Sequence, residues 1–134
     1  MENKKIKWLI YTVLVGLIPI MSRLLIWLVS NKVGIEVLNA SDFVAFGLVL
    51  HISNINEIEH LEPADKSWKT IHNGISIIFI AFYSVLFATF LLGSTQPAMI
   101  DIKAIKIASI VLSAVSLLIS YAVYYRISIS SGGN

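Results

Sequence analysis

The sequence predicts an all-α integral membrane protein, with four transmembrane helices in an up-down antiparallel bundle. Of the 134 residues, 57% are hydrophobic and only 13% are charged, whereas a typical soluble domain is about 25% charged. Four largely apolar stretches approach the roughly 20 residues that a helix needs to cross the hydrocarbon core. The links between them are short, and short links make sequential helices antiparallel neighbours. We therefore expect residues 1–130 to form a single transmembrane domain.

The first two spans are expected at about residues 8–29 and 37–60. The first is interrupted by Pro19, Ser22 and Arg23. Lysines precede it, as in a signal peptide, but the apolar run is too long for one and no small-x-small cleavage site follows. We therefore expect an uncleaved span. The second is apolar in its first half and increasingly polar in its second.

The third span, at about 70–92, is the most uniformly apolar, and the fourth is expected at about 104–127. Glycine and proline, which interrupt regular structure, occur in the links at Gly34, Pro63, Gly93 and Pro97. The closing residues 131–134 are typical of a flexible tail. Six lysines and arginines fall on the side of the termini and three on the other, so the positive-inside rule places both termini in the cytoplasm.

Small residues recur at helical spacing in the last two spans, which is typical of close helix packing in membranes. One stripe consists of Ser109, Ser113, Ser116 and Ser120. The other consists of Gly74, Ala81, Ser84 and Ala88. Both are interpreted as packing seams, within one chain or between copies in an oligomer. A water-lined pathway of serine hydroxyls is the alternative for these stripes.

Two charges lie well inside the spans rather than near a span end, and unpaired charges at such a position are costly. Arg23 and Asp42 are expected at similar depth, on either side of the first link, and we predict that they form an ion pair. In the alternative, Asp42 and Ser41 cap the second helix while Arg23 extends to the membrane surface.

A polar stripe follows the second span, because at about 100° per residue its polar side chains share one sector: Asp42, Ser53, Asn56, Glu57 and His60. The stripe either lines a cavity or pore in an oligomer, or continues into a cytoplasmic surface for a partner. The residues expected to bind that partner lie between Asn54 and Lys69: Asn54, Asn56, Glu57, Glu59, His60, Glu62, Asp65, Lys66 and Lys69.

Catalytic and metal chemistry find no support in the sequence. There is no cysteine, no acid–base or nucleophile pair converges, and the three histidines lack metal-ligand spacing. We therefore expect no catalytic residue, no metal and no cofactor. His51, near the middle of its span, is interpreted as a hydrogen-bonded packing residue rather than a proton relay. A net charge of +2 gives no reason to expect direct nucleic-acid binding.

The four-span plan, together with the stretch SDFVAFGLVLHISNINEIEH, resembles the KwaA family, the membrane subunits of the Kiwa bacterial anti-phage defence system. Small multidrug transporters do not fit, because they carry a glutamate in the first span, where this chain has Arg23 and no acid. The resemblance implies a homo-oligomer, with a tetramer favoured, in the bacterial inner membrane. It also implies a sensor of phage attack whose cytosolic partner binds DNA.

Taken together, these features predict a non-enzymatic, oligomeric sensor or scaffold that contacts membrane lipids, detects membrane perturbation and recruits a cytosolic protein. One alternative is a channel-forming or membrane-depolarising effector, in which a polar stripe lines a pore. A weaker alternative is an immunity protein that neutralises a membrane-acting toxin.

Overall fold

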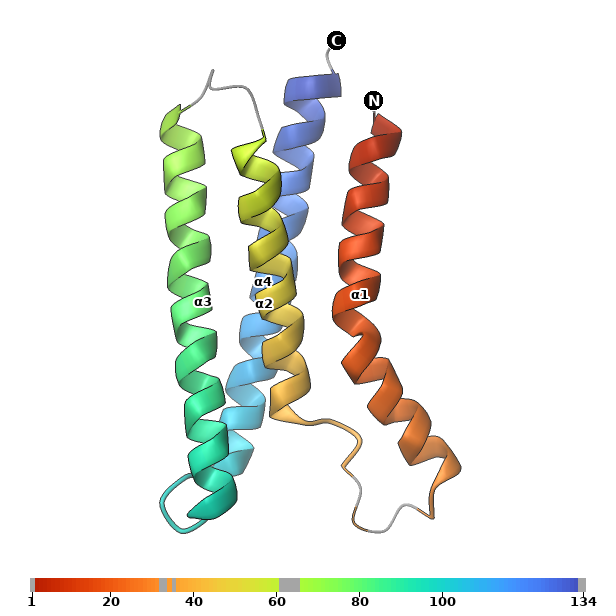
Figure 1. Ribbon diagram of the computed structural model, residues 1–134, viewed down its shortest axis with the longest axis vertical. Coiled ribbons are helices and arrows are strands. Elements are labelled where there is room, and N and C mark those ends of the chain that lie inside the picture. Colours follow the sequence, from red (N-terminus) through yellow and green to blue (C-terminus); the bar gives the residue numbers. More distant parts are fainter. Residues whose placement is uncertain (1, 32–33, 35, 61–65, 133–134) are drawn as a thin grey trace.

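A computed structural model describes residues 2–31, 34, 36–60 and 66–132, and these residues form four helices joined by short links. The helices are α1 (Glu2–Val29), α2 (Ala40–Glu59), α3 (Lys66–Thr95) and α4 (Ile102–Gly132). Each helix runs antiparallel to the one before it, so both ends of the chain lie at the same end of the bundle (Figure 1). The predicted all-α, up-down bundle is confirmed.

Helices α2 and α4 run parallel to each other and form the centre of the bundle (Figure 1). Helix α1 packs against both of them, and α3 packs against both as well, whereas no contact joins α1 to α3 in the described part of the chain. Helix α2 therefore touches all three of the other helices.

Three of the described helices are long and apolar enough to cross a membrane: α1 over Lys7–Val29, α3 over Lys66–Thr95 and α4 over Ile102–Ile127. Helix α2, the second expected span, does not meet the same measure. Nine of its residues are nevertheless buried, because it packs against all three of the other helices. Much of the least apolar helix is thus covered by the more apolar ones.

The helix ends differ from the expected spans because capping and helix propagation, rather than hydropathy, set them. Asn39 caps α2, and its side-chain oxygen accepts a hydrogen bond from the Ser41 amide at 2.9 Å, so α2 begins at Ala40 rather than near residue 37. Each residue added to an existing helix gains a hydrogen bond. Helix α4 accordingly extends to Gly132, into the expected tail at 131–134, whose last two residues lie outside the described ones.

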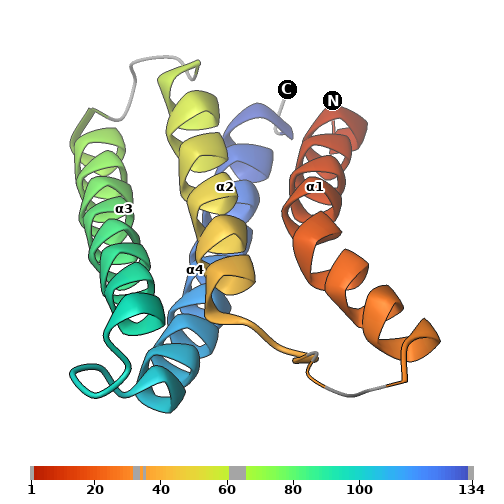
Figure 2. The same ribbon diagram turned by 60° about the horizontal axis from the view of Figure 1, so that its bottom comes forward.

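Helix α1 contains Pro19, which removes one backbone hydrogen bond and crowds the preceding turn. Bends in helices commonly occur at proline. The second half of α1 bends away from the rest of the bundle (Figure 1), and the divergence from α2 is visible again in the second view (Figure 2). Helices α1 and α2 are therefore separated toward the end opposite the termini.

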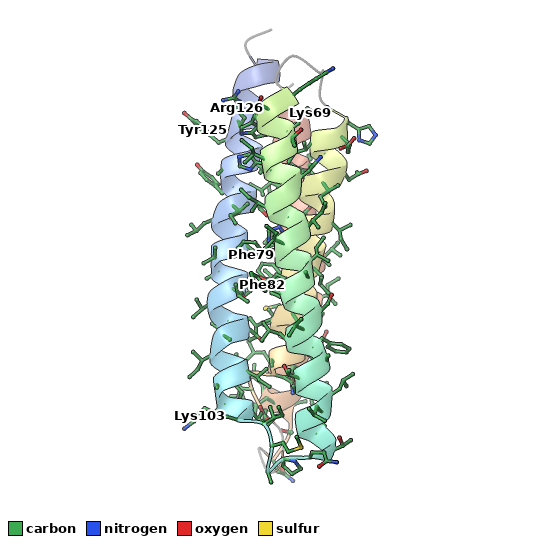
Figure 3. All side chains as sticks on the ribbon, turned by 90° about the vertical axis from the view of Figure 1, so that its left-hand side faces the viewer. Lys69, Phe79, Phe82, Lys103, Tyr125 and Arg126 are labelled. Carbon is green, nitrogen blue, oxygen red and sulfur yellow. The ribbon has the colours of Figure 1, made fainter. Side chains whose placement is uncertain are left out.

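The surface of the bundle is arranged as a membrane requires. Lys69, Tyr125 and Arg126 gather near the end that carries the termini, Lys103 lies at the other end, and Phe82 projects between them (Figure 3). The guanidinium of Arg126 lies 5.3 Å from the ring centroid of Trp68. Cationic and aromatic side chains are typical of the two membrane surfaces.

Candidate functional site

A buried polar cluster joins three helices at the middle of the bundle. The ring of His51 on α2 contacts two serine hydroxyls, with Nδ1 3.1 Å from Ser76 Oγ on α3 and Nε2 2.8 Å from Ser116 Oγ on α4. The Tyr83 hydroxyl on α3 also lies 2.6 Å from Ser116 Oγ. All four side chains are buried. His51 thus has the hydrogen-bonded packing role that the sequence predicts.

The close approach of α3 to α2 depends on Gly47. A Cβ at this position would overlap the ring and hydroxyl of Tyr83. The absence of a side chain lets Tyr83 reach across α2 to Ser116, while Phe79 stacks on His51 with ring centroids 4.8 Å apart. Sequence reasoning did not single out Ser76 and Tyr83. Their seven-residue spacing, which places both on one helix face, is the signal that could have identified them.

The serine stripe of α4 faces the interior, as expected for a packing seam within the chain. Its four members are all buried: Ser109, Ser113, Ser116 and Ser120. Their hydrogen bonding differs, because Ser113 donates to the Ile110 carbonyl at 2.9 Å, whereas the hydroxyls of Ser109 and Ser120 have no partner among the described residues.

The stripe predicted on α3 lies elsewhere. Ala81, Ser84 and Ala88 are exposed, and no atom of another helix lies within 4 Å of a Cβ built on Gly74. These residues therefore do not form a seam within the chain, because α3 turns the face of Ser76 and Tyr83 inward instead. A seam between copies of the chain stays a prediction for this stripe.

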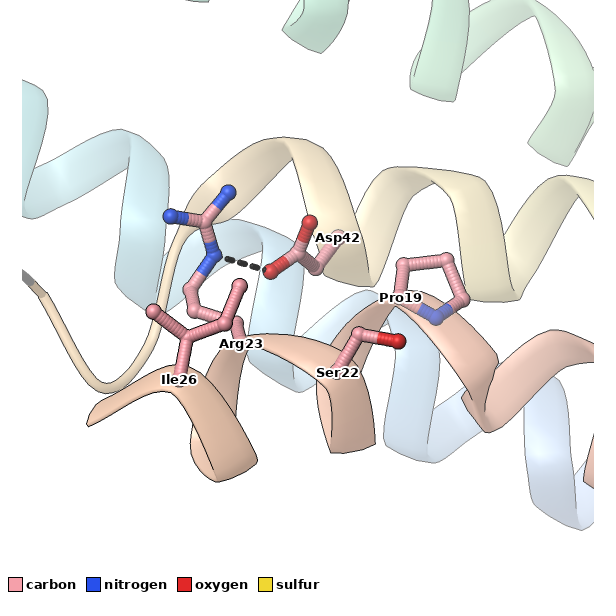
Figure 4. Close-up of a pocket in the computed structure, with 5 residues that line it drawn as sticks. All are labelled: Pro19, Ser22, Arg23, Ile26 and Asp42. Atoms are coloured by element: carbon pink, nitrogen blue, oxygen red, sulfur yellow. Dashed lines mark hydrogen bonds and ion pairs between the residues drawn. The ribbon is translucent and has the colours of Figure 1, made fainter. Parts of the chain in front are cut away.

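Arg23 and Asp42 form an ion pair between α1 and α2, with Arg23 Nε 2.5 Å from Asp42 Oδ2. Asp42 lies in the first turn of α2, but the cap is Asn39. Beside the pair is a cavity of about 350 Å³, lined by Pro19, Ser22, Arg23, Ile26 and Asp42 (Figure 4). The pair therefore lies where bent α1 separates from α2.

The polar stripe predicted along α2 is divided between two environments. Ser53 faces α1, where its hydroxyl accepts a hydrogen bond from Trp8 Nε1 at 2.5 Å and lies 2.9 Å from Thr12 Oγ1. Asp42 also faces α1, through the ion pair. Only the far end of the stripe, at Asn56 and His60, is exposed. The inner part of the stripe therefore holds α1 against α2.

The predicted partner-binding residues divide in the same way. Asn54 is wrong as a surface contact, because it is fully buried between the helices and neither atom of its amide group has a described partner. Glu57 and Lys69 are half-buried. The exposed members are Asn56, Glu59, His60 and Lys66. Glu62 and Asp65 lie outside the described residues.

The four exposed residues, Asn56, Glu59, His60 and Lys66, form what we call the polar end of the bundle. They lie where α2 ends and α3 begins, at the same end as both termini (Figure 1). Glu59 accepts a hydrogen bond from Asn73 Nδ2 at 2.7 Å, which ties the two helices together at this surface.

The chain thus has polar groups at three levels: the ion pair near one end, the His51 cluster in the middle and the polar end at the other. In the comparisons with known proteins, no protein-family model, no curated protein and no solved structure matches the chain.

Proposed function

We propose that this protein is a non-enzymatic membrane scaffold and sensor that recruits a cytosolic protein through its polar end. The observation that carries the proposal is the exposure of Asn56, Glu59, His60 and Lys66 together at the end of the bundle that carries the termini. Charged residues at a helix end commonly face solvent or a partner. The exposed groups include both signs, so the surface suits a partner with mixed charges of its own.

The position of α2 supports a sensing role. This helix carries most of the polar end and packs against all three of the other helices. A change in the bilayer acts first on the lipid-facing helices α1, α3 and α4, and each of them contacts α2 directly. A shift in their packing would therefore move the residues that bind the partner.

The excess of lysine and arginine at this end supports a cytoplasmic location for it. We further propose a homo-oligomer, with a tetramer favoured, in a bacterial inner membrane, acting in anti-phage defence with a DNA-binding partner. The four-span resemblance described above supports this part of the proposal.

The test is charge reversal of Glu59, in the polar end, together with Glu57 and Glu62, the acidic residues next to it in the sequence. We expect the triple variant Glu57→Lys, Glu59→Lys and Glu62→Lys to lose co-purification with soluble proteins that the unaltered chain captures from cytosol, while its insertion into membranes is unchanged. Glu36→Lys combined with Lys106→Glu is the control, because Glu36 is also exposed but lies at the opposite end of the bundle, and the exchange keeps an ion pair between the two positions. Equal capture by the triple variant, the control and the unaltered chain would refute the proposal.

A channel is the second candidate. The observation that favours it is a set of buried polar groups along α2 and α4 that have no hydrogen-bond partner among the described residues: Asn54, Ser109 and Ser120. Buried polar groups without protein partners commonly hold water, and a continuous file of water would conduct protons. Ion and proton flux into liposomes containing the purified protein distinguishes the two functions. If the vesicles that contain the protein remain impermeable, a constitutive channel is excluded and the scaffold function is retained.

A further inference from the structure

We infer that the cavity between α1 and α2 binds the headgroup of a zwitterionic phospholipid that has a primary ammonium group, the phosphatidylethanolamine class. The phosphate of the lipid would contact Arg23, and the ammonium would contact Asp42. This site is separate from the polar end and does not depend on the recruitment of a partner.

The shape of the cavity suits a lipid that enters from the side. The cavity, of about 350 Å³, combines two charged side chains with the Ser22 hydroxyl and the apolar surfaces of Pro19 and Ile26. Its lining residues come from the part of α1 that begins at Pro19 and from the first turn of α2, and the second half of α1 diverges from α2 (Figure 2). The side chain of Arg23 remains 33% exposed there. A phospholipid offers the same combination, a charged headgroup next to apolar chains.

The depth of the cavity is also appropriate. Arg23 lies six residues before the end of α1 at Val29, which corresponds to about 9 Å along a helix. Asp42 lies in the first turn of α2. Both are therefore near one end of the bundle, where the headgroup region borders the hydrocarbon core.

The ion pair leaves donors and an acceptor unused. Asp42 engages only the Nε edge of the guanidinium, and the two terminal nitrogens of Arg23 have no partner among the described residues (Figure 4). Arginine suits a phosphate because its planar group offers several N–H donors at once. The second carboxylate oxygen of Asp42 likewise has no described hydrogen bond. Polar groups without hydrogen-bond partners are costly inside a membrane. A zwitterionic headgroup would provide an acceptor for the nitrogens of Arg23 and a donor for the carboxylate of Asp42.

The charge of the site selects among lipids. The pair is neutral overall. An anionic headgroup would therefore be attracted by the guanidinium of Arg23 and repelled by the carboxylate of Asp42. A choline headgroup has a quaternary ammonium, which cannot donate a hydrogen bond to the carboxylate. The ethanolamine headgroup has both the phosphate and the N–H donors, and we expect it to bind best.

The experiment measures lipid retention by native mass spectrometry of the full chain in detergent, with phosphatidylethanolamine, phosphatidylcholine or phosphatidylglycerol of the same acyl chains. We expect phosphatidylethanolamine to be retained in preference to the other two. Arg23→Gln and Asp42→Asn should each weaken its binding about tenfold, the effect of losing one charge-assisted contact. Ser22→Phe, which fills the cavity and keeps both charges, should also reduce binding.

The matched control is another ion pair, between Glu36 and Lys106, in which Lys106 Nζ lies 2.8 Å from Glu36 Oε2. Glu36→Gln with Lys106→Gln removes a pair that does not line the cavity, and we expect lipid binding to be unchanged. Asp42→Asn keeps the shape and a hydrogen-bonding group, so it remains informative if Arg23→Gln does not fold. Equal retention of the three lipids, or an ethanolamine preference that persists in the cavity variants, would overturn the inference.

Discussion

The contact between Gly47 and Tyr83 gives the most direct test of how the bundle is packed. We predict that Gly47→Ala destabilises the protein, although alanine is a better helix former than glycine. The reason is steric, because the added Cβ would overlap three atoms at the hydroxyl end of the Tyr83 ring. That ring is fully buried and is held by its hydrogen bond to Ser116.

The expected magnitude is a difference of two terms. Replacing glycine by alanine inside a helix gains about 1 kcal/mol. Overpacking a filled interior costs about 1–3 kcal/mol, and the upper part of this range applies because Tyr83 cannot move without losing Ser116. The net loss in the free energy of unfolding is therefore about 1–2 kcal/mol for Gly47→Ala.

Gly74 provides a matched control on α3. A Cβ at this position meets nothing within 4 Å, so Gly74→Ala keeps only the favourable term, up to about 1 kcal/mol. Unfolding by SDS in mixed micelles, followed by the fluorescence of the three tryptophans, measures both variants. We expect their unfolding free energies to change with opposite signs.

Equal tolerance of the two substitutions would refute the packing described for α2 and α3. A double-mutant cycle sharpens the test, because Tyr83→Leu removes all three of the atoms that a Cβ on Gly47 would meet. The combination Gly47→Ala with Tyr83→Leu should therefore be more stable than the sum of the single changes predicts, by about 1 kcal/mol or more. Strict additivity would contradict the contact.

Three further predictions concern polar groups and use the same unfolding measurement. Ser116→Ala removes two interhelical hydrogen bonds and should cost about 1 kcal/mol, because such bonds average about 0.6 kcal/mol each in membrane bundles; no measurable loss would argue against the cluster. Ser109→Ala should cost less than about 0.5 kcal/mol, because its hydroxyl has no described partner; a larger loss would indicate a bound water. Lys106→Gln should change stability by less than about 0.5 kcal/mol, as exposed ion pairs do, although Lys106 pairs with Glu36.

The fold was largely predictable from the sequence because hydropathy and link length constrain a short membrane chain strongly. The expected spans at 8–29, 70–92 and 104–127 all fall within α1, α3 and α4. The ends were less predictable, since α3 continues from Lys66 to Thr95. Hydropathy reports which residues suit the membrane, whereas helix ends depend on caps and on hydrogen bonds that polar residues also form.

The sites were predictable in part, and the reason differs between them. Arg23 and Asp42 are the charges that lie clearly inside the expected spans. The high free energy of an unpaired charge in the membrane is enough to predict that they pair, and the structure shows the ion pair. Periodicity also identified the buried serine stripe. It failed for the stripe of Ala81, because a helical period defines a face without saying whether the face meets a helix, lipid or water. Asn54 was assigned to the partner surface from its position along the chain, and position alone does not say which way a side chain faces.

Whether a helix face meets another helix or lipid depends on how the helices of different polarity are arranged in the bundle. Helix α2 is the least suited to lipid, and it packs against all three of the other helices. In a membrane the apolar helices gain nothing from contact with one another that lipid does not also offer, so polar groups and close packing determine their partners. Ser53 is hydrogen-bonded to α1, and His51 is hydrogen-bonded to α3 and α4. Asp42 forms an ion pair with the second half of α1. Three of the polar residues that make α2 less apolar than its neighbours, Asp42, His51 and Ser53, are therefore contacts that join the other helices to it.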